Sequence, residues 1–424
     1  MTVQPQDSRG GPEGRSTPDV LVLVMSTRTY RAGAFMDAAR RAGAAVTVAS
    51  ERAQALSPMN PSGHLTLDLA DPAAVDAIAA FGRERRIAAV VAADDDGVVL
   101  AARASAALGL PHHAPAAVAA AIDKRLSREV FRAAGLPAPG FEAVPLDADP
   151  AAAAARVGFP CVVKPLTLSA SRGVIRADDP DGLAAAFARS AAIVRASPGA
   201  LPTLLIERYV PGIEVALEGL MDGGALIPLA LFDKPYPLEG PFFEETIYVT
   251  PSRLEHSVQE RIVKTAARAA AALGLAHGPV HAELRIDAGV ATPLEIAPRS
   301  IGGLCARALR FAGGRTLEDV LLEHALGRLA AHPEREAAAS GVMMIPIPRA
   351  GTLHGVRGLD VARRVESVED VRITIPVGER LVPLPEGARY LGFIFARAAE
   401  PDAVERALRR AHRTLEFDIE AGDA

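Results

Sequence analysis

Cysteine is scarce in this sequence. Only two of its 424 residues are cysteines, Cys161 and Cys305, and each lies in an apolar or glycine-rich context. Two thiols cannot build a disulfide framework for a chain of this length. The sequence therefore argues against a disulfide-stabilised secreted scaffold, and we expect a reducing, cytoplasmic compartment.

Long apolar runs and blocks of like charge are also missing. No stretch approaches the roughly 20 apolar residues that a membrane-spanning helix needs. Residues 1–18 lack the apolar centre of a signal peptide, and we expect a disordered tail there. The 46 basic and 51 acidic residues give a net charge of −5 without a broad basic face. We therefore expect a small-molecule partner rather than nucleic acid or a membrane.

Strand and helix patterns alternate in the first quarter of the chain. Apolar runs at residues 20–25, 45–49 and 87–92 predict strands, separated by helical patterns that end near Arg41 and Arg85. The alternation predicts an open parallel sheet. The turn after the first strand reads STRTY instead of the G-x-G-x-x-G of a dinucleotide-binding turn, so a nicotinamide enzyme is disfavoured.

Half of the residues are hydrophobic, which is enough for several packed units. A helical pattern over residues 114–134 precedes a stretch broken by proline and glycine, and short strands with alanine-rich helices follow. The predicted fold class is a combination of α/β and α+β. The expected divisions are the tail at 1–18, an N-terminal α/β domain at 19–113, a small subdomain with a linker helix at 114–210, a second subdomain at 211–330 and a C-terminal α+β part at 331–424.

A lysine at the end of a buried-type strand is the first chemical signal. Lys164 lies in the run CVVKP and is followed by the small-residue loop SASRGV at residues 169–174. Such a loop can fold its amides over phosphate oxygens, and the lysine suits the phosphates of ATP. Lysines also end strands for solubility alone, and this motif by itself does not decide between the two interpretations.

A strand, a Pro–Gly turn and a second strand follow at residues 204–214. Glu207 and Glu214 flank the turn. A hinge of this kind can offer backbone groups to adenine, and Glu214 can accept hydrogen bonds from ribose hydroxyls. Taken alone, both glutamates fit solvated edge positions better.

Residues 281–296 predict a β-hairpin with acidic side chains on one face. We expect a three-residue loop at 287–289 that places Ile286 opposite Val290. One face then collects the polar side chains of His281, Glu283, Arg285 and Glu295. Glu283 and Glu295 become diagonal neighbours, an arrangement that favours a shared hard cation such as Mg²⁺. The alternative is a solvent-facing sheet on which the glutamates pair with Arg285.

An arginine follows this hairpin at a short distance. Arg299 lies four residues after Glu295, and Gly302 and Gly303 come next. A guanidinium suits bidentate contact with phosphate or carboxylate, and glycines let the backbone approach a ligand closely. Arg307 fits a second substrate contact and a helix-surface charge equally well.

In this order, the motifs are similar to those of the ATP-grasp superfamily of carboxylate–amine ligases, over residues 20–420. The resemblance implies an ATP-grasp fold: a pre-ATP-grasp domain at 19–113, a lid subdomain at 114–210 and a catalytic subdomain at 211–330. It implies Mg²⁺ ligands at Glu283 and Glu295, with Mn²⁺ able to substitute. The implied nucleotide contacts are Lys124, Lys164, Ser169, Ser171, Arg172, Gly173, Glu207, Tyr209, Val210, Glu214 and His281.

Two positions depart from the pattern of better-known members. Ala297 stands where many carry an asparagine that helps to hold a second metal, an absence shared with the amino-acid ligase branch that residues 297–303 resemble. In that branch a loop glutamate is expected near a substrate amino group, and Glu245 is the candidate here, followed by Glu244. Tyr248 stands where the branch often has a histidine, which implies a different substrate.

The resemblance implies phosphoryl transfer from ATP to a small carboxylate, followed by attack of a small amine on the acylphosphate. Arg299, Lys164 and Glu245 are the expected catalytic residues. Further substrate contacts are expected at Tyr248, Gly302, Gly303 and Arg307. Two alternatives stay open: a biotin-carboxylase-like use of bicarbonate, although the chain has no Met-Lys-Met sequence, and a nucleotide sensor without catalysis. The identities of the substrates are open, as is a homodimer.

Overall fold

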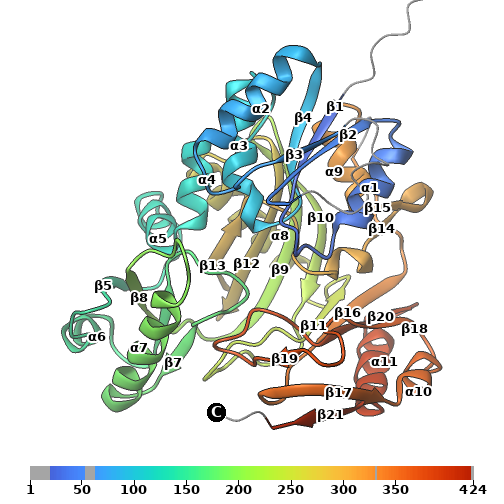
Figure 1. The fold of residues 1–424 in the computed structure, drawn as a ribbon. Helices are drawn as coiled ribbons and strands as arrows, with labels where there is room; N and C mark the ends of the chain where they lie inside the picture. Colours follow the sequence, from blue (N-terminus) through green and yellow to red (C-terminus); the bar gives the residue numbers. More distant parts are fainter. Residues whose placement is uncertain (1–19, 53–62, 330–331, 422–424) are drawn as a thin grey trace, which may run out of the picture.

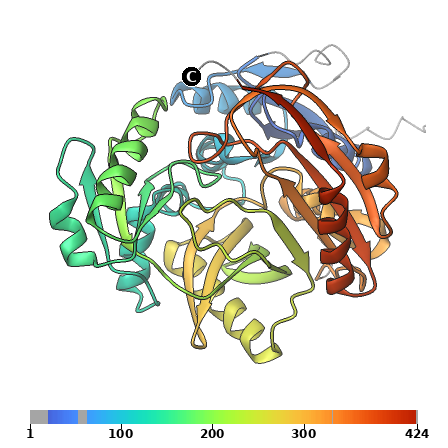
Figure 2. The ribbon, with the colours of Figure 1, turned by 90° about the horizontal axis from the view of Figure 1, so that it is seen from below.

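The structure, a computed structural model, describes residues 20–52, 63–329 and 332–421. Figure 1 shows the N-terminal domain at the top, the lid subdomain at the lower left and the C-terminal strands at the lower right, around a central sheet. Seen from below, the lid and the C-terminal part lie on opposite sides of that sheet (Figure 2). The predicted tail at residues 1–18 lies outside the described residues.

A four-stranded parallel sheet forms the N-terminal domain, as predicted. Its strand order is β3-β2-β1-β4. All five residues of β1 are buried, which explains the continuous apolar run in the sequence. The strands are β1 (Val20–Val24), β2 (Ala45–Ser50), β3 (His64–Thr66) and β4 (Ile87–Ala92). The helices are α1 (Ala32–Arg41), α2 (Ala73–Glu84) and α3 (Val98–Ala107), with a short 3₁₀ turn, η2 (Asp95–Gly97).

The single helix predicted over residues 114–134 is wrong, because two helices occupy this segment. They are α4 (Pro115–Ile122) and α5 (Lys124–Ala133), separated at Asp123. Asp123 leaves the helical conformation, and its carboxylate accepts hydrogen bonds from the backbone N–H groups of Arg125 and Leu126, at 2.8 and 3.1 Å. Such an N-cap starts a new helix. Lys124 is thereby placed at the first position of α5.

The lid subdomain is an antiparallel sheet with two helices. Its strand order is β5-β8-β6-β7. The strands are β5 (Phe141–Pro145), β6 (Cys161–Pro165), β7 (Ile175–Ala177) and β8 (Thr203–Arg208), and the helices are α6 (Ala151–Val157) and α7 (Pro180–Arg195). Lys164 sits near the end of β6, so the predicted loop of residues 169–173 connects β6 to β7.

One eight-stranded sheet forms the centre of the molecule, in the order β13-β12-β9-β10-β11-β16-β20-β18. Its strands are β9 (Ile213–Asp222), β10 (Ala225–Asp233), β11 (Ile247–Thr250), β12 (Gly278–Asp287), β13 (Val290–Ala297), β16 (Ala339–Ile345), β18 (Val368–Ile373) and β20 (Gly392–Ala398). Pairing of β11 with β16 carries the hydrogen bonding across the boundary predicted near residue 331. The long helix α8 (His256–Leu273) shares a buried apolar cluster with β9, β12 and β13.

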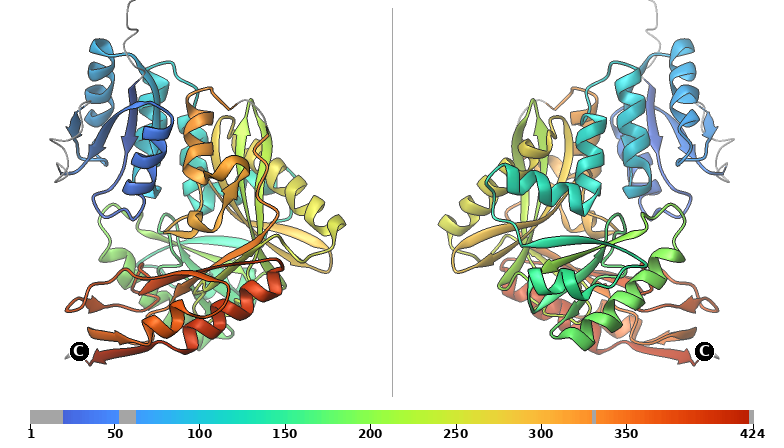
Figure 3. Two further views of the ribbon diagram at one scale, coloured as in Figure 1. Left: turned by 90° about the vertical axis from the view of Figure 1, so that its right-hand side faces the viewer. Right: turned by 90° about the vertical axis from the view of Figure 1, so that its left-hand side faces the viewer.

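Smaller elements complete the C-terminal half. A three-stranded sheet, β19-β17-β21, lies at the end of the molecule away from the N-terminal domain (Figure 3). The remaining elements are η3 (Cys305–Ala308), β14 (Arg310–Phe311), η4 (Ala312–Gly314), β15 (Arg315–Thr316), α9 (Leu317–Ala325), β17 (Gly351–Arg357), α10 (Leu359–Arg363), β19 (Arg380–Leu381), α11 (Pro401–Arg413) and β21 (Glu416–Glu420). Among the described residues no helix combines the length and apolar character that a membrane span requires.

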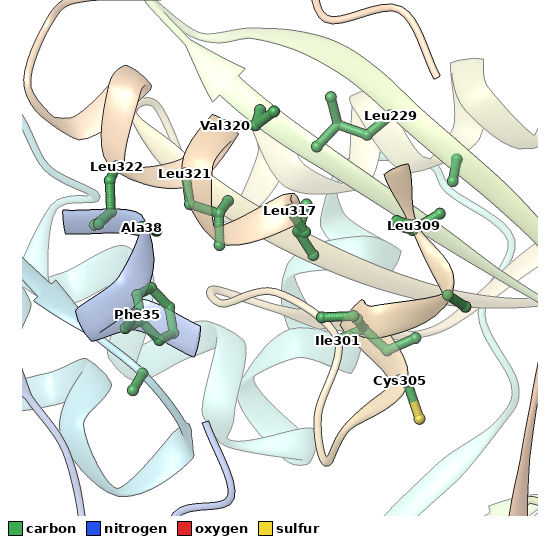
Figure 4. Packing of buried hydrophobic residues seen from close by; sticks show 14 of the residues in the cluster. Phe35, Ala38, Leu229, Ile301, Cys305, Leu309, Leu317, Val320, Leu321 and Leu322 are labelled. Atoms are coloured by element: carbon green, nitrogen blue, oxygen red, sulfur yellow. The ribbon is translucent and has the colours of Figure 1, made fainter. Parts of the chain in front are cut away.

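A shared hydrophobic core joins the N-terminal domain to the central sheet. Phe35 of α1 packs with Leu317 and Leu321 of α9, and the same cluster reaches Ile301 (Figure 4). Phe35 is completely buried, and removing such a side chain typically costs about 3–5 kcal/mol. The segment around Ile301 is therefore held firmly at the interface of the two units.

The β12–β13 hairpin has a register different from the predicted one. Its turn has two residues, Ala288 and Gly289, both with positive φ. Val290 is therefore paired with Asp287 instead of with Ile286. A bulge then shifts the register between Glu283 and Leu284. As a result Glu283 lies directly opposite Glu295 instead of diagonally. The predicted pairing was wrong, although the two carboxylate residues are neighbours.

Candidate active site

The ammonium group of Lys234 lies among three carboxylates. This residue directly follows β10, and its Nζ donates to Oε1 of Glu214, Glu245 and Glu283 at 2.8, 2.5 and 2.9 Å. Its side chain is only 2% exposed. Burial alone would lower the pKa of Lys234, but the three carboxylates raise it well above its usual value. The lysine is therefore charged and fixes the carboxylates around it.

Glu283 and Glu295 face each other across the hairpin, and His281 extends the polar row. Nδ1 of His281 lies 3.1 Å from Oε2 of the fully buried Glu218, and Nε2 lies 3.6 Å from Oε1 of Glu283. Burial lowers the pKa of His281, but these two carboxylates outweigh it and raise the pKa to about 9. The imidazole is thus a cation, and Glu218 also accepts the backbone N–H of Ile301 at 3.0 Å.

Lys164 and Glu207 form a buried ion pair at the base of the lid. Glu207 also accepts from Nε of Arg128 at 2.9 Å. Burial would raise the pKa of Glu207, but Arg128 and Lys164 overcome it and lower the pKa to about 2. Burial also lowers the pKa of Lys164. The Glu207 side chain is therefore engaged within the protein, which leaves its backbone for any contact with adenine.

Lys124 and the loop after β6 occupy the same side of the lid. The Nζ of Lys124 donates to the carbonyl of Leu168 at 2.8 Å. Within the loop, Ser171 and Gly173 have positive φ, and Arg172 donates to the carbonyl of Glu386 at 3.0 Å. The exposed Ser169 opens the loop. Three residues of this loop, Ala170, Ser171 and Gly173, thus have left-handed backbone conformations next to Lys124, where the phosphate site is predicted.

The hinge between the lid and β9 is held by Arg285. This buried arginine donates to Oε2 of Glu214 at 2.9 Å, and to the Tyr209 hydroxyl and the Val210 carbonyl at 2.8 Å each. Gly212 follows with φ of 95°, and a Cβ at this position would lie 2.1 Å from the carbonyl oxygen of Ile286. Only glycine fits there. The hinge is consequently pinned to the hairpin that carries Glu283.

Arg299 connects the hairpin to the N-terminal domain. Its Nε donates to Oδ1 of Asp95, in η2, at 2.5 Å. Arg31 reinforces the junction, because it donates to the Ser300 hydroxyl at 2.8 Å and pairs with Glu318 at 2.9 Å. The Asp95 charge raises the pKa of Arg299, against the effect of burial. The N-terminal domain therefore orients the arginine expected to bind phosphate.

The predicted substrate residues fall into two groups. Glu245 lies in the cluster around Lys234, and the ring of the buried Tyr248 lies beneath the same ammonium, 5.0 Å from its Nζ. Burial raises the pKa of Glu244 to about 6. Arg307 instead pairs with Asp370 of β18 at 3.0 Å and lies over the Phe395 ring. Gly303 packs near the Phe393 ring, and Gly302 is exposed.

Sequence models of three known domains match the chain. An ATP-grasp domain matches residues 157–308, an ATP-grasp N-terminal domain matches 36–112, and L-amino acid ligase C-terminal domain 2 matches 343–420. The structure of an L-amino acid ligase from Bacillus licheniformis superimposes with a TM-score of 0.80 at 25% identity, covering 95% of this chain and 99% of that one. The chain is an ATP-grasp ligase.

Relatives with named activities align with about half of this ATP-grasp chain. A D-alanine–D-alanine ligase from a Synechococcus species is 29% identical over 53% of this chain and 72% of its own length. An alanine–anticapsin ligase from Bacillus subtilis is 28% identical over 52% of this chain and 47% of its own. A biotin carboxylase domain from Hydrogenobacter thermophilus superimposes with a TM-score of 0.69 at 17% identity, over 94% of this chain and 90% of that one, which shows a common fold.

Sequence reasoning missed Lys234, although a signal for it was present. Of the 46 basic residues of this ATP-grasp chain only four are lysines, and three of them, Lys124, Lys164 and Lys234, lie at the site. Arginine supplies nearly all of the remaining positive charge. Because a lysine ammonium is a compact point charge on a flexible stem, it is not interchangeable with arginine. The rarity of lysine thus marks Lys234.

Asp95, Arg128 and Glu218 were missed as well, for a different reason. Each is a charged group that pairs with a predicted site residue: Asp95 with Arg299, Arg128 with Glu207, and Glu218 with His281. They lie far from their partners in sequence. Their signal is tertiary, and no local motif could have identified them.

Proposed function

We propose that this ligase joins the carboxylate of an amino acid to an amine through an acylphosphate, with release of ADP and phosphate. The observation that carries the proposal is the Lys234 cluster, in which Glu214, Glu245 and Glu283 converge on one ammonium beside Glu295. The matches to amino-acid ligases support the same choice of substrates. Phosphoryl transfer needs little besides positioning and charge neutralisation, which such a cluster supplies.

Three cationic side chains serve the phosphates in this proposal. Lys124 and Lys164 face them from the lid, and Arg299 faces them from the segment after β13. A guanidinium offers a bidentate contact to phosphate oxygens, which makes Arg299 the group that stabilises the transferring phosphoryl. Asp95 holds that guanidinium through a 2.5 Å hydrogen bond. Charge is therefore offset from both sides of the nucleotide.

The carboxylates fit a magnesium ion. Glu214, Glu245 and Glu283 each give one oxygen to Lys234, and Glu295 faces Glu283 across the hairpin, so Glu283 and Glu295 are the pair proposed to hold the ion. Hard oxygen donors of this kind suit Mg²⁺, and Mn²⁺ can take its place. When bound by Glu283 and Glu295, the ion would supply charge neutralisation at the phosphates. Ala297 leaves the chain without the asparagine ligand of a second metal.

Glu245 is proposed to receive the amino group of a substrate. It lies between Lys234 and Glu283, and burial raises the pKa of its carboxyl. The ammonium group of a substrate would form a further ion pair with the Glu245 carboxylate. The loop of residues 240–246, which carries Glu245, lies against the lid. Contacts between this loop and the lid include the backbone N–H of Arg176, which donates to the Pro241 carbonyl at 2.9 Å. Closing the lid thus also closes this side of the pocket and excludes water.

The proposal is tested by incubating the enzyme with ATP, Mg²⁺ and pooled amino acids, with and without added amines. Because each amino acid carries both a carboxylate and an amine, ADP and phosphate should form in equal amounts with the pool, with or without added amines, and mass spectrometry should detect the amide. Release of AMP and pyrophosphate would contradict the acylphosphate route. Release of ADP with bicarbonate alone would instead favour a carboxylase-like reaction.

A metal-ligand variant separates catalysis from nucleotide sensing. Glu295→Gln should lower turnover by about a hundredfold, the usual size of losing a charge-stabilising group, while ATP affinity changes little. Glu416→Gln, on the remote strand β21, is a matched control and should behave as the parent. Equal turnover in Glu295→Gln and the parent would refute the metal assignment, and absence of turnover with every pool would favour a sensor.

A further inference from the structure

A second cluster of ligand groups lies at the far end of the central sheet. Asp222 is the last residue of β9, His277 immediately precedes β12, and His324 belongs to α9. Each offers one ligand atom, and the three atoms lie within 4.8 Å of one another. Asp222 is eight residues beyond Glu214 on the same strand, which corresponds to roughly 26 Å. This cluster is therefore separate from the nucleotide site.

The spacing of the three groups matches the requirements of a tetrahedral metal site. Oδ1 of Asp222 lies 3.4 Å from Nε2 of His324 and 3.6 Å from Nδ1 of His277. Metal–ligand bonds of about 2.1 Å in a tetrahedron place neighbouring ligands about 3.4 Å apart. The imidazole rings of His277 and His324 are stacked, with centroids 4.2 Å apart. Nδ1 of His277 and Nε2 of His324 thus lie next to the same carboxylate oxygen.

A purely structural role leaves these groups poorly satisfied. The contact between His324 and Asp222 is long for a hydrogen bond. Within the described part of the chain, Nε2 of His277 is buried and has no hydrogen-bond partner. The ring nitrogen of His277 beside the carboxylate is Nδ1, and its distance of 3.6 Å from Oδ1 of Asp222 is too long for a hydrogen bond. An ion between these groups would bind Nδ1 of His277, Nε2 of His324 and the Asp222 carboxylate together.

His113 holds the segment that presents His277. Its Nδ1 accepts hydrogen bonds from the backbone N–H groups of Ala276 and His277 at 3.2 and 3.3 Å, so its Nε2 carries the proton donated to the Pro279 carbonyl at 3.1 Å. Both nitrogens of His113 are thus in use, and it is a positioning residue rather than a ligand.

We propose that Asp222, His277 and His324 form a binding site for a divalent transition-metal ion, with Zn²⁺ as the preferred ion and water completing the coordination. Two imidazoles and one carboxylate suit Zn²⁺, Co²⁺ or Ni²⁺ and do not suit Mg²⁺. The ion would tie the end of β9, the start of β12 and helix α9 together. Because α9 packs on α1, it would also stabilise the interface with the N-terminal domain.

Metal binding to the full chain tests the proposal. Protein without an affinity tag is stripped with a chelator and titrated with Zn²⁺ in excess Mg²⁺, which occupies the carboxylates of the nucleotide site. Calorimetry and metal analysis after gel filtration should show one tightly held Zn²⁺ per chain, with a rise in the melting temperature. A parent protein that holds no Zn²⁺ under these conditions would overturn the proposal.

Two variants and a matched control locate the ion. Asp222→Asn and His277→Asn change partly exposed side chains and should weaken Zn²⁺ binding by about tenfold or more. His256→Asn, at an exposed histidine of α8 that contacts Glu260, should bind as the parent does. Zn²⁺ affinity equal to that of the parent in Asp222→Asn and His277→Asn would contradict the site. Glu283→Gln should keep the ion, which distinguishes this site from the catalytic one.

Discussion

Asp95 and Arg299 are 204 residues apart in sequence, and their side chains meet at 2.5 Å between the N-terminal domain and the catalytic hairpin. The pair makes the orientation of the guanidinium proposed to bind phosphate depend on a domain that contributes no other predicted nucleotide contact. Hydrogen bonds to charged groups are worth about 1.5–3 kcal/mol. Arg299 therefore depends on Asp95 for its position.

This relationship predicts graded effects on turnover. Arg299→Lys keeps the charge but loses the planar fork, and kcat should fall by about a hundredfold. Asp95→Asn keeps the shape and weakens the orientation, and kcat should fall about tenfold with little change in the KM for ATP. Asp96→Asn, on the exposed neighbour in η2, serves as the control. Steady-state kinetics check this, and an unaffected Asp95→Asn would show that Arg299 is positioned without it.

Replacing Lys234 should disable the site more completely than any single carboxylate change. Lys234→Met keeps the length and removes the charge, which leaves three carboxylates in mutual repulsion, so we expect kcat to fall by at least about a hundredfold. Lys264→Met, at the exposed fourth lysine on α8, is the matched control. Circular dichroism and thermal unfolding separate misfolding from a catalytic defect. Normal turnover in folded Lys234→Met would remove Lys234 from the site.

The lid is fastened to the C-terminal part through Arg189 and Glu386. Their side chains form a bidentate pair at 2.6 and 2.9 Å, and the backbone N–H of Gly173 donates to the Pro385 carbonyl at 2.9 Å. Exposed pairs contribute up to about 1 kcal/mol, so Arg189→Glu should raise the KM for ATP by at most about fivefold and leave kcat intact. The double variant Arg189→Glu/Glu386→Arg should restore the parent KM. A double variant that keeps the raised KM would show that the Arg189–Glu386 ion pair does not hold the lid against the C-terminal part.

Asp94 should make stability depend on pH in an unusual direction. Burial raises the pKa of its carboxyl to about 6, so the folded protein binds a proton more readily than the unfolded chain between pH 4 and 6. Stability from this group therefore falls as pH rises through that window, by roughly 2 kcal/mol after allowance for partial solvation. Asp94→Asn should remove this loss.

Denaturant unfolding of the parent and Asp94→Asn at pH 4 and pH 7 measures the effect. The stability of the variant relative to the parent should increase with pH, whereas Asp96→Asn at the exposed neighbour should show no such trend. A constant difference between Asp94→Asn and the parent would show that the Asp94 carboxyl titrates normally.

The N-terminal sheet was readable from sequence because burial on both faces leaves a continuous apolar run. β1 and β4 were predicted to within one residue at each end. The break at Asp123 was not predicted, because a single aspartate does not by itself interrupt an alanine-rich helical pattern. Only the structure shows that its side chain caps the next helix. The spacing of apolar residues predicts which face of a helix is buried. The N-cap at Asp123 changes the backbone hydrogen bonds and leaves that spacing unchanged, so the spacing did not reveal the break.

The hairpin shows how a correct neighbour can come from an incorrect register. The turn at Ala288 and Gly289 was misjudged by one residue, and the bulge beside Glu283 was not predicted. The bulge lies next to Pro293, which has no backbone N–H to donate to the ladder. The motif order still pointed to Glu283 and Glu295. What no pattern could supply was the convergence of Lys234 on them, since it depends on β10 and β12 both lying next to β9.

Continuous main-chain hydrogen bonding from β13 to β18 has a mechanical consequence. The strands that carry Glu214, Glu283 and Glu295 belong to the same eight-stranded sheet as the C-terminal strands β16, β20 and β18. The chain passes between the lid and that sheet near residues 134–140 and 209–212, and the other contacts of the lid described above are made with loops. We therefore expect that any opening of the lid for nucleotide exchange bends the chain at these two crossings and leaves the mutual geometry of Glu214, Glu283 and Glu295 unchanged.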